Sequence, residues 1–268
     1  MTSVSLGPAL ASDKNSAVLK NYDFGGTYRM KKVLAFLLAL SMCLALVTGC
    51  SKIDSDDPAQ KGPEFDIYLG TKVMNLDPAI SYTDENAVKV LSLIFEGLTK
   101  LDENGKLKKA LAKKWEIVED PKTGEDYLEI TINDTYWSDG SSVQANDVIY
   151  AWKRILDPEF SCSAAALLFD VKNARDVKNG DNSIDDLGIA AVDTYTLQIE
   201  FETKIDLDQF FENCSSVALV PLREDVVDDI TKDWCKPNGT TYVTNGPFKI
   251  KAWNSGELIF ERSVNYRC

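Results

Sequence analysis

Residues 127–158 read YLEITINDTYWSDGSSVQANDVIYAWKRILDP, a stretch in which a strand, a turn and a helix follow one another. Apolar and polar residues alternate over 127–132, which is typical of a half-buried strand. Asp139-Gly140 predicts a turn, and Asp157-Pro158 ends the segment that follows it. The apolar residues of that segment recur at the spacing of one helix face: Val148, Ala151, Trp152 and Ile155. The stretch therefore predicts a domain that mixes strands and helices.

Strand and helix patterns are interspersed on both sides of this stretch without a regular repeat. Alternation predicts further strands, and helical spacing between turn residues predicts further helices. The expected strands cover residues 64–70, 196–201, 248–253 and 258–261, the last two as a hairpin. The expected helices cover residues 85–98, 111–115, 207–211 and 226–230. This order predicts a mixed α/β fold.

The composition excludes several classes of function. The chain has 268 residues, 29 Lys and Arg against 42 Asp and Glu, a formal net charge of −13, and no His. No His-based triad or His general base is possible, and a common zinc ligand is missing. The negative charge argues against nucleic acid and against an anionic membrane surface as partners. Three acidic pairs lack calcium-loop spacing, so we interpret them as solvated surface and expect neither a metal nor a cofactor: Glu119-Asp120, Asp185-Asp186 and Asp228-Asp229.

Residues 30–49 have the pattern of a bacterial lipoprotein signal peptide. A short basic start precedes the almost wholly apolar residues 33–47, and small residues lie just before Cys50. This apolar run is short for a membrane-spanning helix, which needs roughly 20 residues. We therefore expect Cys50 to be lipidated at the outer face of the cytoplasmic membrane, with a transmembrane anchor as the alternative. Residues 50–63 are then a solvated tether, and we interpret residues 1–29 as a start-site artefact.

Four cysteines follow the signal: Cys162, Cys214, Cys235 and Cys268. In an exported protein such thiols can pair, and four of them allow three complete connectivities. Cys214 and Cys235 are the first pair to test for a possible disulfide, because both lie near a turn-rich segment. No Cys-x-x-Cys spacing is present, which argues against a metal site or a thioredoxin-like site.

A series of short motifs extends over about 200 residues, between residues 64 and 266. The motifs are Leu76-Asp77-Pro78, Phe95-Glu96-Gly97-Leu98, Leu111-Ala112 with Trp115, Trp137-Ser138-Asp139-Gly140, Ala145 with Asp147-Val148, Tyr150 to Arg154, Asp157-Pro158 and Thr244-Asn245-Gly246-Pro247-Phe248. Their order resembles the peptide/nickel family of ABC-transporter solute-binding proteins, and within it the oligopeptide-binding lipoproteins. No single motif is decisive, but the shared order is.

The resemblance implies a periplasmic-binding-protein-like fold. Members of the family have two lobes joined by a hinge, with an extra subdomain inserted in the first lobe, and they enclose their ligand between the lobes. By analogy, residues 64–95 and 222–268 form the sheet of the first lobe, and residues 96–221 form the inserted α/β subdomain. The chain ends where the family continues, so we expect an N-terminal portion that is truncated, with the second lobe absent.

The resemblance also implies a receptor and not an enzyme. Such receptors capture oligopeptides in the periplasm or extracellular space through main-chain hydrogen bonds, and deliver them to the permease and ATPase subunits of a bacterial importer. We expect a monomer held at the membrane by its lipid anchor. Ser81, Tyr82 and Thr83 match the place where the family presents an extended backbone to the peptide. Asn245 and Gly246 would line the same wall, and ordinary turns are the alternative at both places.

Other functions stay open at this point. The solute could instead be a dipeptide, a signalling peptide, an oligosaccharide or a metal chelate. An exported hydrolase would need a nucleophile with a base, and no Gly-x-Ser-x-Gly or Ser-x-x-Lys motif is present. A non-functional remnant is a further possibility. Trp115, Trp137 and Trp152 could stack on a ligand, but we interpret them as core residues.

Overall fold

The computed structural model describes residues 67–71, 73, 75–228, 234–235, 242–254 and 257–266. Contacts divide the chain into Met1–Asp66 and a second unit, Ile67–Cys268, to which all described residues belong. The predicted signal peptide, Cys50, the tether and Cys268 lie outside the described residues. Within the described part, no helix is long and apolar enough to cross a membrane.

A four-stranded antiparallel sheet carries the middle of the chain. Its strands are β3 (Ala112–Glu119), β4 (Asp126–Ile132), β5 (Ile189–Asp193) and β6 (Thr196–Ile199). They lie in the order β3-β4-β6-β5. Leu128 and Ile130 of β4 are fully buried and lie opposite Ile199 and Leu197 of β6, so one face of the sheet is apolar. The strand predicted from alternation over residues 127–132 is confirmed.

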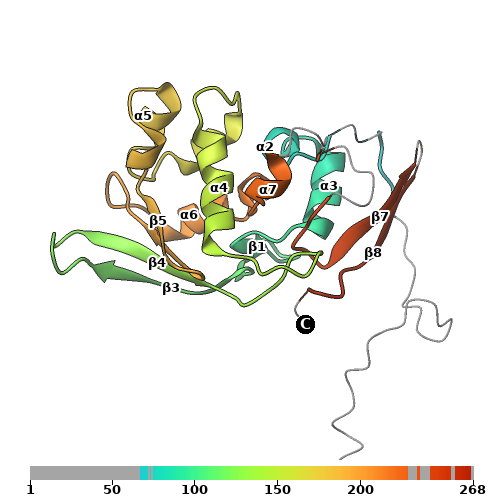
Figure 1. Ribbon diagram of the computed structural model, residues 1–268, viewed down its shortest axis with the longest axis horizontal. Coiled ribbons are helices and arrows are strands. Elements are labelled where there is room, and N and C mark those ends of the chain that lie inside the picture. The colour runs from blue at the N-terminus through green and yellow to red at the C-terminus, as the bar shows by residue number, and fades with distance from the viewer. Residues whose placement is uncertain are drawn as a thin grey trace, which may run out of the picture. The chain divides into compact units, whose positions relative to one another are not determined.

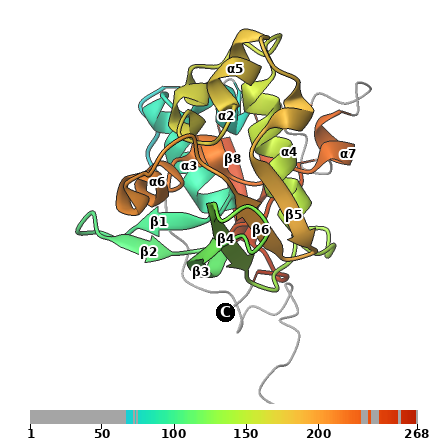
Figure 2. The ribbon, with the colours of Figure 1, turned by 90° about the vertical axis from the view of Figure 1, so that its left-hand side faces the viewer.

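Helices α4, α5 and α6 cover one face of this sheet, as Figures 1 and 2 show. The 12-residue α4 (Ala145–Leu156) buries the stripe that its sequence spacing predicts. The Asp147 carboxylate begins this helix by accepting a hydrogen bond from the Gln144 N–H at 2.8 Å, which satisfies a donor of the first turn. The shorter helices are η2 (Ser163–Leu168), α5 (Ala174–Asn179), η3 (Ile184–Asp186), α6 (Leu207–Asn213) and η4 (Val217–Leu219).

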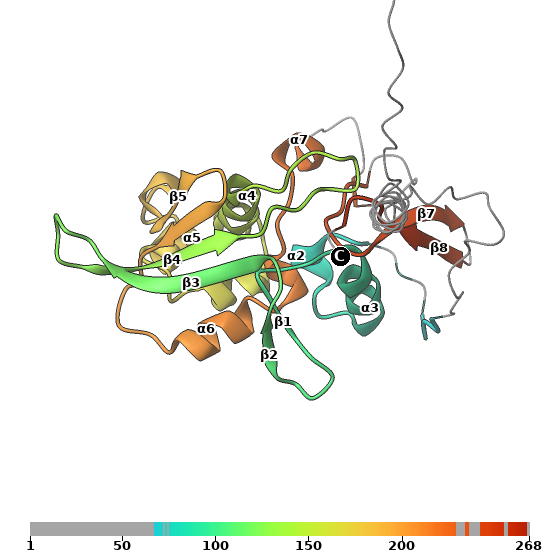
Figure 3. The same cartoon turned by 90° about the horizontal axis from the view of Figure 1, so that it is seen from below.

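The segments before and after this sheet and its helices pack together. They form α2 (Pro78–Ser81), α3 (Glu85–Ile94), β1 (Thr99–Leu101), β2 (Leu107–Lys109), α7 (Glu224–Val227), β7 (Phe248–Asn254) and β8 (Glu257–Arg262). Strands β7 and β8 form the expected antiparallel hairpin, and α3 packs against β7. A second hairpin, β1–β2, points away from β3 in Figure 3.

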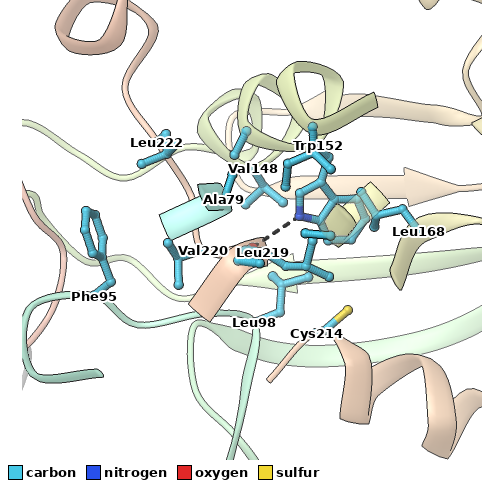
Figure 4. Close-up of a cluster of buried hydrophobic side chains, with 14 of the residues drawn as sticks. Ala79, Phe95, Leu98, Val148, Trp152, Leu168, Cys214, Leu219, Val220 and Leu222 are labelled. Atoms are coloured by element: carbon cyan, nitrogen blue, oxygen red, sulfur yellow. Dashed lines mark hydrogen bonds between the residues drawn. The ribbon is translucent and has the colours of Figure 1, made fainter. Parts of the chain in front are cut away.

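One hydrophobic core joins these parts, and Figure 4 shows the side chains at its centre. Trp152 of α4 is 1% exposed, and its indole N–H donates to the Leu219 carbonyl at 3.2 Å. Trp137 is fully buried. Trp115 lies at the margin of the core, where its ring stacks on Phe211 with centroids 4.0 Å apart. The interpretation of these tryptophans as core residues is therefore confirmed for Trp137 and Trp152, and Trp115 packs beside them.

The helix expected over residues 111–115 is wrong, because Ala112–Trp115 begin strand β3. Trp115 lies opposite Ile130 of β4 in an antiparallel register, and the Asn133 N–H donates to the Leu111 carbonyl at 2.8 Å. Pairing with the neighbouring strand overrides the helix propensity of the Leu, Ala and Lys residues in this segment.

The helix expected over residues 85–98 is shorter and ends at Ile94. Phe95 is already extended, with φ −123° and ψ 153°. The Ile94 carbonyl accepts a hydrogen bond from the Gly246 N–H at 2.8 Å, from a segment far along the chain, where a longer helix would use it internally. At the other end of this region, described residues 67–70 of the strand expected over 64–70 are not in a strand.

The possible disulfide between Cys214 and Cys235 is not formed. Cys214 is a free thiol at the end of α6, 1% exposed and enclosed by the core shown in Figure 4. Burial raises the pKa of this thiol well above its usual value. Cys235 lies elsewhere, where its carbonyl accepts a hydrogen bond from the Leu76 N–H at 3.1 Å. Cys214 is thus a small apolar core residue and not half of a crosslink.

Candidate functional site

Helix α2 begins at the Leu76-Asp77-Pro78 motif and carries the first group of predicted site residues at its end. The Asp77 carboxylate caps the helix by accepting the Ala79 N–H at 3.0 Å, and Pro78 occupies the first helical position, where its missing N–H has no cost. Asp77 is 2% exposed. A buried cap therefore fixes where α2 starts and where the residues after it reach the surface.

Ser81, Tyr82 and Thr83 form a tight turn between α2 and α3. Tyr82 has φ −65° and ψ −12°, so the extended backbone expected here is wrong. The Asp84 N–H donates to the Ser81 carbonyl at 3.0 Å and closes the turn, and the Asp84 carboxylate then caps α3. The turn is held from both sides because α2 ends and α3 begins within four residues.

The three side chains of this turn have different surroundings. Ser81 is 8% exposed and points inward, where its hydroxyl donates to the Asn75 carbonyl at 3.0 Å. The half-buried Tyr82 shares a hydrogen bond of 2.8 Å between its hydroxyl and the Ser163 Oγ at the start of η2. Thr83 is exposed. Tyr82 and Thr83 of this turn, with Ser163 beside them, are thus the residues that a ligand can reach.

Both polar atoms of the Asn245 side chain are hydrogen-bonded to the backbone of Glu96. Its Oδ1 accepts the Glu96 N–H at 3.0 Å, and its Nδ2 donates to the Glu96 carbonyl at 2.8 Å. Asn245 is 2% exposed. The side-chain amide expected to face a peptide is therefore engaged inside the protein, and the alternative of a structural turn describes this residue better.

Gly246 allows two backbones to approach closely. Its N–H donates to the Ile94 carbonyl at 2.8 Å, and a Cβ atom at this position would lie 2.7 Å from the same oxygen. That distance is shorter than real Cβ contacts, so only glycine fits here. Asn245 and Gly246 together fasten the lead into β7 to the end of α3.

The two groups of predicted site residues lie at opposite ends of α3. The turn at Ser81–Thr83 precedes Glu85, the first residue of the helix, and Gly246 is bonded to Ile94, its last residue. A helix of 10 residues is about 15 Å long at 1.5 Å per residue. The structure therefore does not bring the two groups together, but it adds Ser163 to the first.

The Trp137-Ser138-Asp139-Gly140 motif is a junction between distant segments. Ser138 donates its N–H to the Thr244 carbonyl at 2.7 Å, and its Oγ accepts the Thr244 N–H at 3.1 Å. Its carbonyl accepts a hydrogen bond from Asn265 Nδ2 at 3.1 Å. The motif thus holds both ends of the β7–β8 hairpin, and its role is structural.

Arg223 fixes the turn of this motif electrostatically. Its Nη1 lies 3.0 Å from Asp139 Oδ2, and its Nη2 lies 2.5 Å from Asp225 Oδ2. Burial alone would raise the pKa of Asp139, but hydrogen bonds from Ser141 and Arg223 outweigh it and lower that pKa. Ser141 also donates both its N–H and its hydroxyl to Asp139 Oδ1.

Burial raises the pKa of Asp147, which caps α4 and accepts the Trp137 indole N–H at 3.0 Å. Asp147 Oδ2 thus accepts from both Trp137 and Gln144, and this carboxylate has a structural role at the start of α4. Among the described residues, no group of three or more Cys, Asp or Glu side chains is placed to hold a metal ion.

The chain is similar to proteins of one family. The family model of bacterial extracellular solute-binding proteins, family 5 Middle, matches residues 106–267. The oligopeptide-binding protein OppA of Bacillus subtilis is 33% identical over 236 residues, which are 87% of this chain and 42% of that protein. The dipeptide-binding protein DppE of the same organism is 32% identical over 89% of this chain and 44% of that protein.

Solved structures agree with these matches. The substrate-binding domain of an oligopeptide ABC transporter from Bacillus anthracis superposes with a TM-score of 0.63 at 30% identity, over 72% of this chain and 36% of that chain. Listeria monocytogenes OppA bound to peptide gives a TM-score of 0.61 at 26% identity, over 72% and 37%. The chain spans less than half the length of each of these proteins.

Proposed function

The chain belongs to family 5 of the bacterial extracellular solute-binding proteins, and we propose that it captures oligopeptides outside the cytoplasmic membrane for an ABC importer. Two relatives support oligopeptides as the solute: the Bacillus subtilis protein is named for oligopeptide binding, and the Listeria monocytogenes structure holds a peptide. In this proposal the protein is a receptor that carries out no chemistry itself and delivers its ligand to permease and ATPase subunits.

The observation that carries the proposal within this chain is the supported surface turn at residues 81–83. Its paired Tyr82 and Ser163 hydroxyls lie at the surface, beside the exposed Thr83. Hydroxyls and main-chain groups suit a peptide of any sequence, because every peptide presents the same amide donors and carbonyl acceptors. We assign Asn245 and Gly246 a supporting role, since their polar side-chain and N–H groups hold Glu96 and Ile94.

The remaining assignments extend the same proposal. Cys50 carries the lipid anchor, residues 50–63 are the tether, and the receptor acts as a monomer in the periplasm or extracellular space. Residues 64–95 and 222–268 belong to the first lobe, and residues 96–221 form its inserted subdomain. The motif at Ser138, which binds both ends of β7–β8, supports this division, because it is the kind of junction that an inserted subdomain needs.

A dipeptide is the second candidate ligand. The Bacillus subtilis protein named for dipeptide binding is nearly as similar to this chain as the one named for oligopeptide binding, at 32% against 33% identity. Ligand length is the variable that separates the two candidates.

Calorimetric titration with peptides of two to five residues tests the proposal. The titration uses the full chain and a fusion protein, in which the part of Bacillus subtilis OppA beyond the matched region follows residue 268. We expect the fusion protein to bind tri- to pentapeptides. Tyr82→Phe should weaken that binding about fivefold, the effect of roughly 1 kcal/mol for one hydrogen bond. Tyr136→Phe is the control at an exposed tyrosine, 41% exposed, and should leave peptide affinity unchanged. Absence of binding to every peptide would contradict the proposal.

A further inference from the structure

Asp77 and Arg154 form a buried ion pair between α2 and α4. Arg154 Nη2 lies 2.6 Å from Asp77 Oδ2, and Arg154 Nη1 donates to Asp77 Oδ1 at 3.2 Å. The Asp77 side chain is 3% exposed and the Arg154 side chain 17%. Two parallel bonds of this kind fix the relative orientation of both groups, which a single contact does not. The pair therefore sets where the cap of α2 lies against α4.

The Arg154 guanidinium also contacts two aromatic rings. It lies 4.1 Å from the centroid of Phe160 and 5.8 Å from that of Trp234. Trp234 stacks on Tyr242, and the Tyr242 hydroxyl donates to the Leu76 carbonyl at 2.5 Å. Arg154, Trp234 and Tyr242 thus link the Asp77 carboxylate to the Leu76 carbonyl. Arg154 in addition contacts Phe160.

The residues just after Phe160 bind the other end of α2. The Cys162 thiol donates to the Ala79 carbonyl at 3.0 Å, and Ser163 shares the hydrogen bond with the Tyr82 hydroxyl. The same guanidinium thus contacts the cap of α2 and the segment that bonds its end. We call the surface formed by Tyr82, Thr83 and Ser163 the peptide wall. A displacement of Arg154 would weaken the Cys162–Ala79 and Ser163–Tyr82 hydrogen bonds there, although Arg154 takes part in neither.

We propose that Arg154 is a positioning residue, which keeps α2 and residues 160–163 in the arrangement that pairs Tyr82 with Ser163. The inference rests on the proposed function in so far as this pair belongs to a peptide-binding wall. Lysine cannot replace Arg154, because an ammonium group lacks the planar fork that bonds both Asp77 oxygens while stacking on Phe160. The charge alone is not sufficient for the role.

The alkylation rate of Cys162 reports how firmly residues 160–163 are held against α2, and that of Cys214 serves as the reference. Neither measurement needs a ligand. Cys162 is half-buried and bonded to α2, whereas Cys214 lies in the core. Alkylation of both thiols is followed by peptide mass spectrometry in the parent, in Arg154→Lys and in Lys153→Arg. Lys153 is the matched control, because it neighbours Arg154 on α4 and pairs at 3.5 Å with the exposed Asp185. Arg154→Lys should speed labelling of Cys162 about tenfold, which corresponds to 1.4 kcal/mol of local opening.

In the same variant Cys214 should keep its labelling rate, and Lys153→Arg should leave both rates unchanged. Equal acceleration at Cys162 and Cys214 would overturn the inference, because it would mean that Arg154 stabilises the whole fold. An unchanged rate at Cys162 would overturn it as well.

Peptide titration of the fusion protein separates this inference from the proposed function. Arg154→Lys should weaken binding about tenfold if the arrangement serves the peptide wall. Unchanged affinity beside faster Cys162 labelling would overturn the positioning role. If the parent fusion protein binds no peptide, the proposed function fails, and the labelling rates still decide whether Arg154 holds α2.

Discussion

Asn245 bonds both the N–H and the carbonyl of Glu96, although the two residues lie 149 positions apart in the sequence. One amide side chain thereby satisfies the N–H and the carbonyl of a residue that leaves α3 and enters β1. Glu96 lies between these two elements, where the Asn245 side chain supplies hydrogen bonds to buried backbone groups.

Replacing Asn245 by Ala should lower the free energy of unfolding by about 3 kcal/mol, because the buried N–H and carbonyl of Glu96 lose their hydrogen bonds to the Asn245 amide. Urea unfolding followed by Trp fluorescence measures the change. Asn182→Ala is the control, since its amide makes an exposed bond of 3.3 Å to Asn173. If Asn245→Ala keeps its stability but loses peptide binding, the structural role of Asn245 is wrong and this residue contacts the peptide.

Gly246→Ala should destabilise the protein by about 2 kcal/mol, because the added methyl group is forced against the Ile94 carbonyl. Gly70→Ala is the matched control: the nearest atom to its added carbon, Asn86 Oδ1, is 4.0 Å away. The midpoint of urea unfolding should move for the first variant and not for the second. Equal midpoints for both would show that the α3 end can move aside.

The Asp139–Arg223 pair should make part of the stability depend on pH. The pKa of Asp139 is lowered in the folded protein from its ordinary value of 3.8, so the ionised carboxylate favours folding. Its contribution is complete above pH 3.8 and is lost as the pH falls through the lower, folded-state pKa. We therefore expect the stability difference between the parent and Asp139→Asn to be constant from pH 5 to 7 and to shrink below pH 3.8.

Asp185→Asn, at an exposed pair with Lys153, controls for the loss of one negative charge. A difference for Asp139→Asn that grows on acidification would contradict the account of this pair.

Lys178 should stabilise the segment from Ile155 to Phe160, which begins at the end of α4. Its ammonium group donates to the carbonyls of Ile155, Asp157 and Phe160 at 3.1, 2.7 and 2.5 Å, and so satisfies the end of α4. Lys178→Met should cost about 2 kcal/mol of stability and also speed alkylation of Cys162. Lys122→Met, at an exposed lysine, should do neither. Retained stability in Lys178→Met would show that water replaces the ammonium group.

The sequence pattern was sufficient where a segment's own periodicity decides its structure. The stripe on α4, the alternation in β4 and the hairpin β7–β8 follow from residues that are close in the chain, and all are confirmed. Strand β3 was not predictable in this way, because its Lys and Ala residues favour a helix until pairing with β4 decides otherwise.

The candidate site was predictable only in part for the same reason. Tyr82 and Thr83 reach the surface as the motif order suggests. The Asn245 amide, however, is hydrogen-bonded to Glu96, 149 positions away. The ion pair of Asp77 with Arg154 spans 77 positions. Both residues lie in motifs that carry the family resemblance, so the sequence did single them out. The spacing of motifs along the chain does not predict which of them are in contact.

Amide hydrogen exchange of the fusion protein, with and without bound peptide, tests most directly whether the turn between α2 and α3 is the peptide wall. We predict that peptide slows exchange at Tyr82 and Thr83, while Gly246, already bonded to Ile94, exchanges equally slowly in both states. Bound peptide that leaves Tyr82 and Thr83 unprotected would contradict the assignment of this turn.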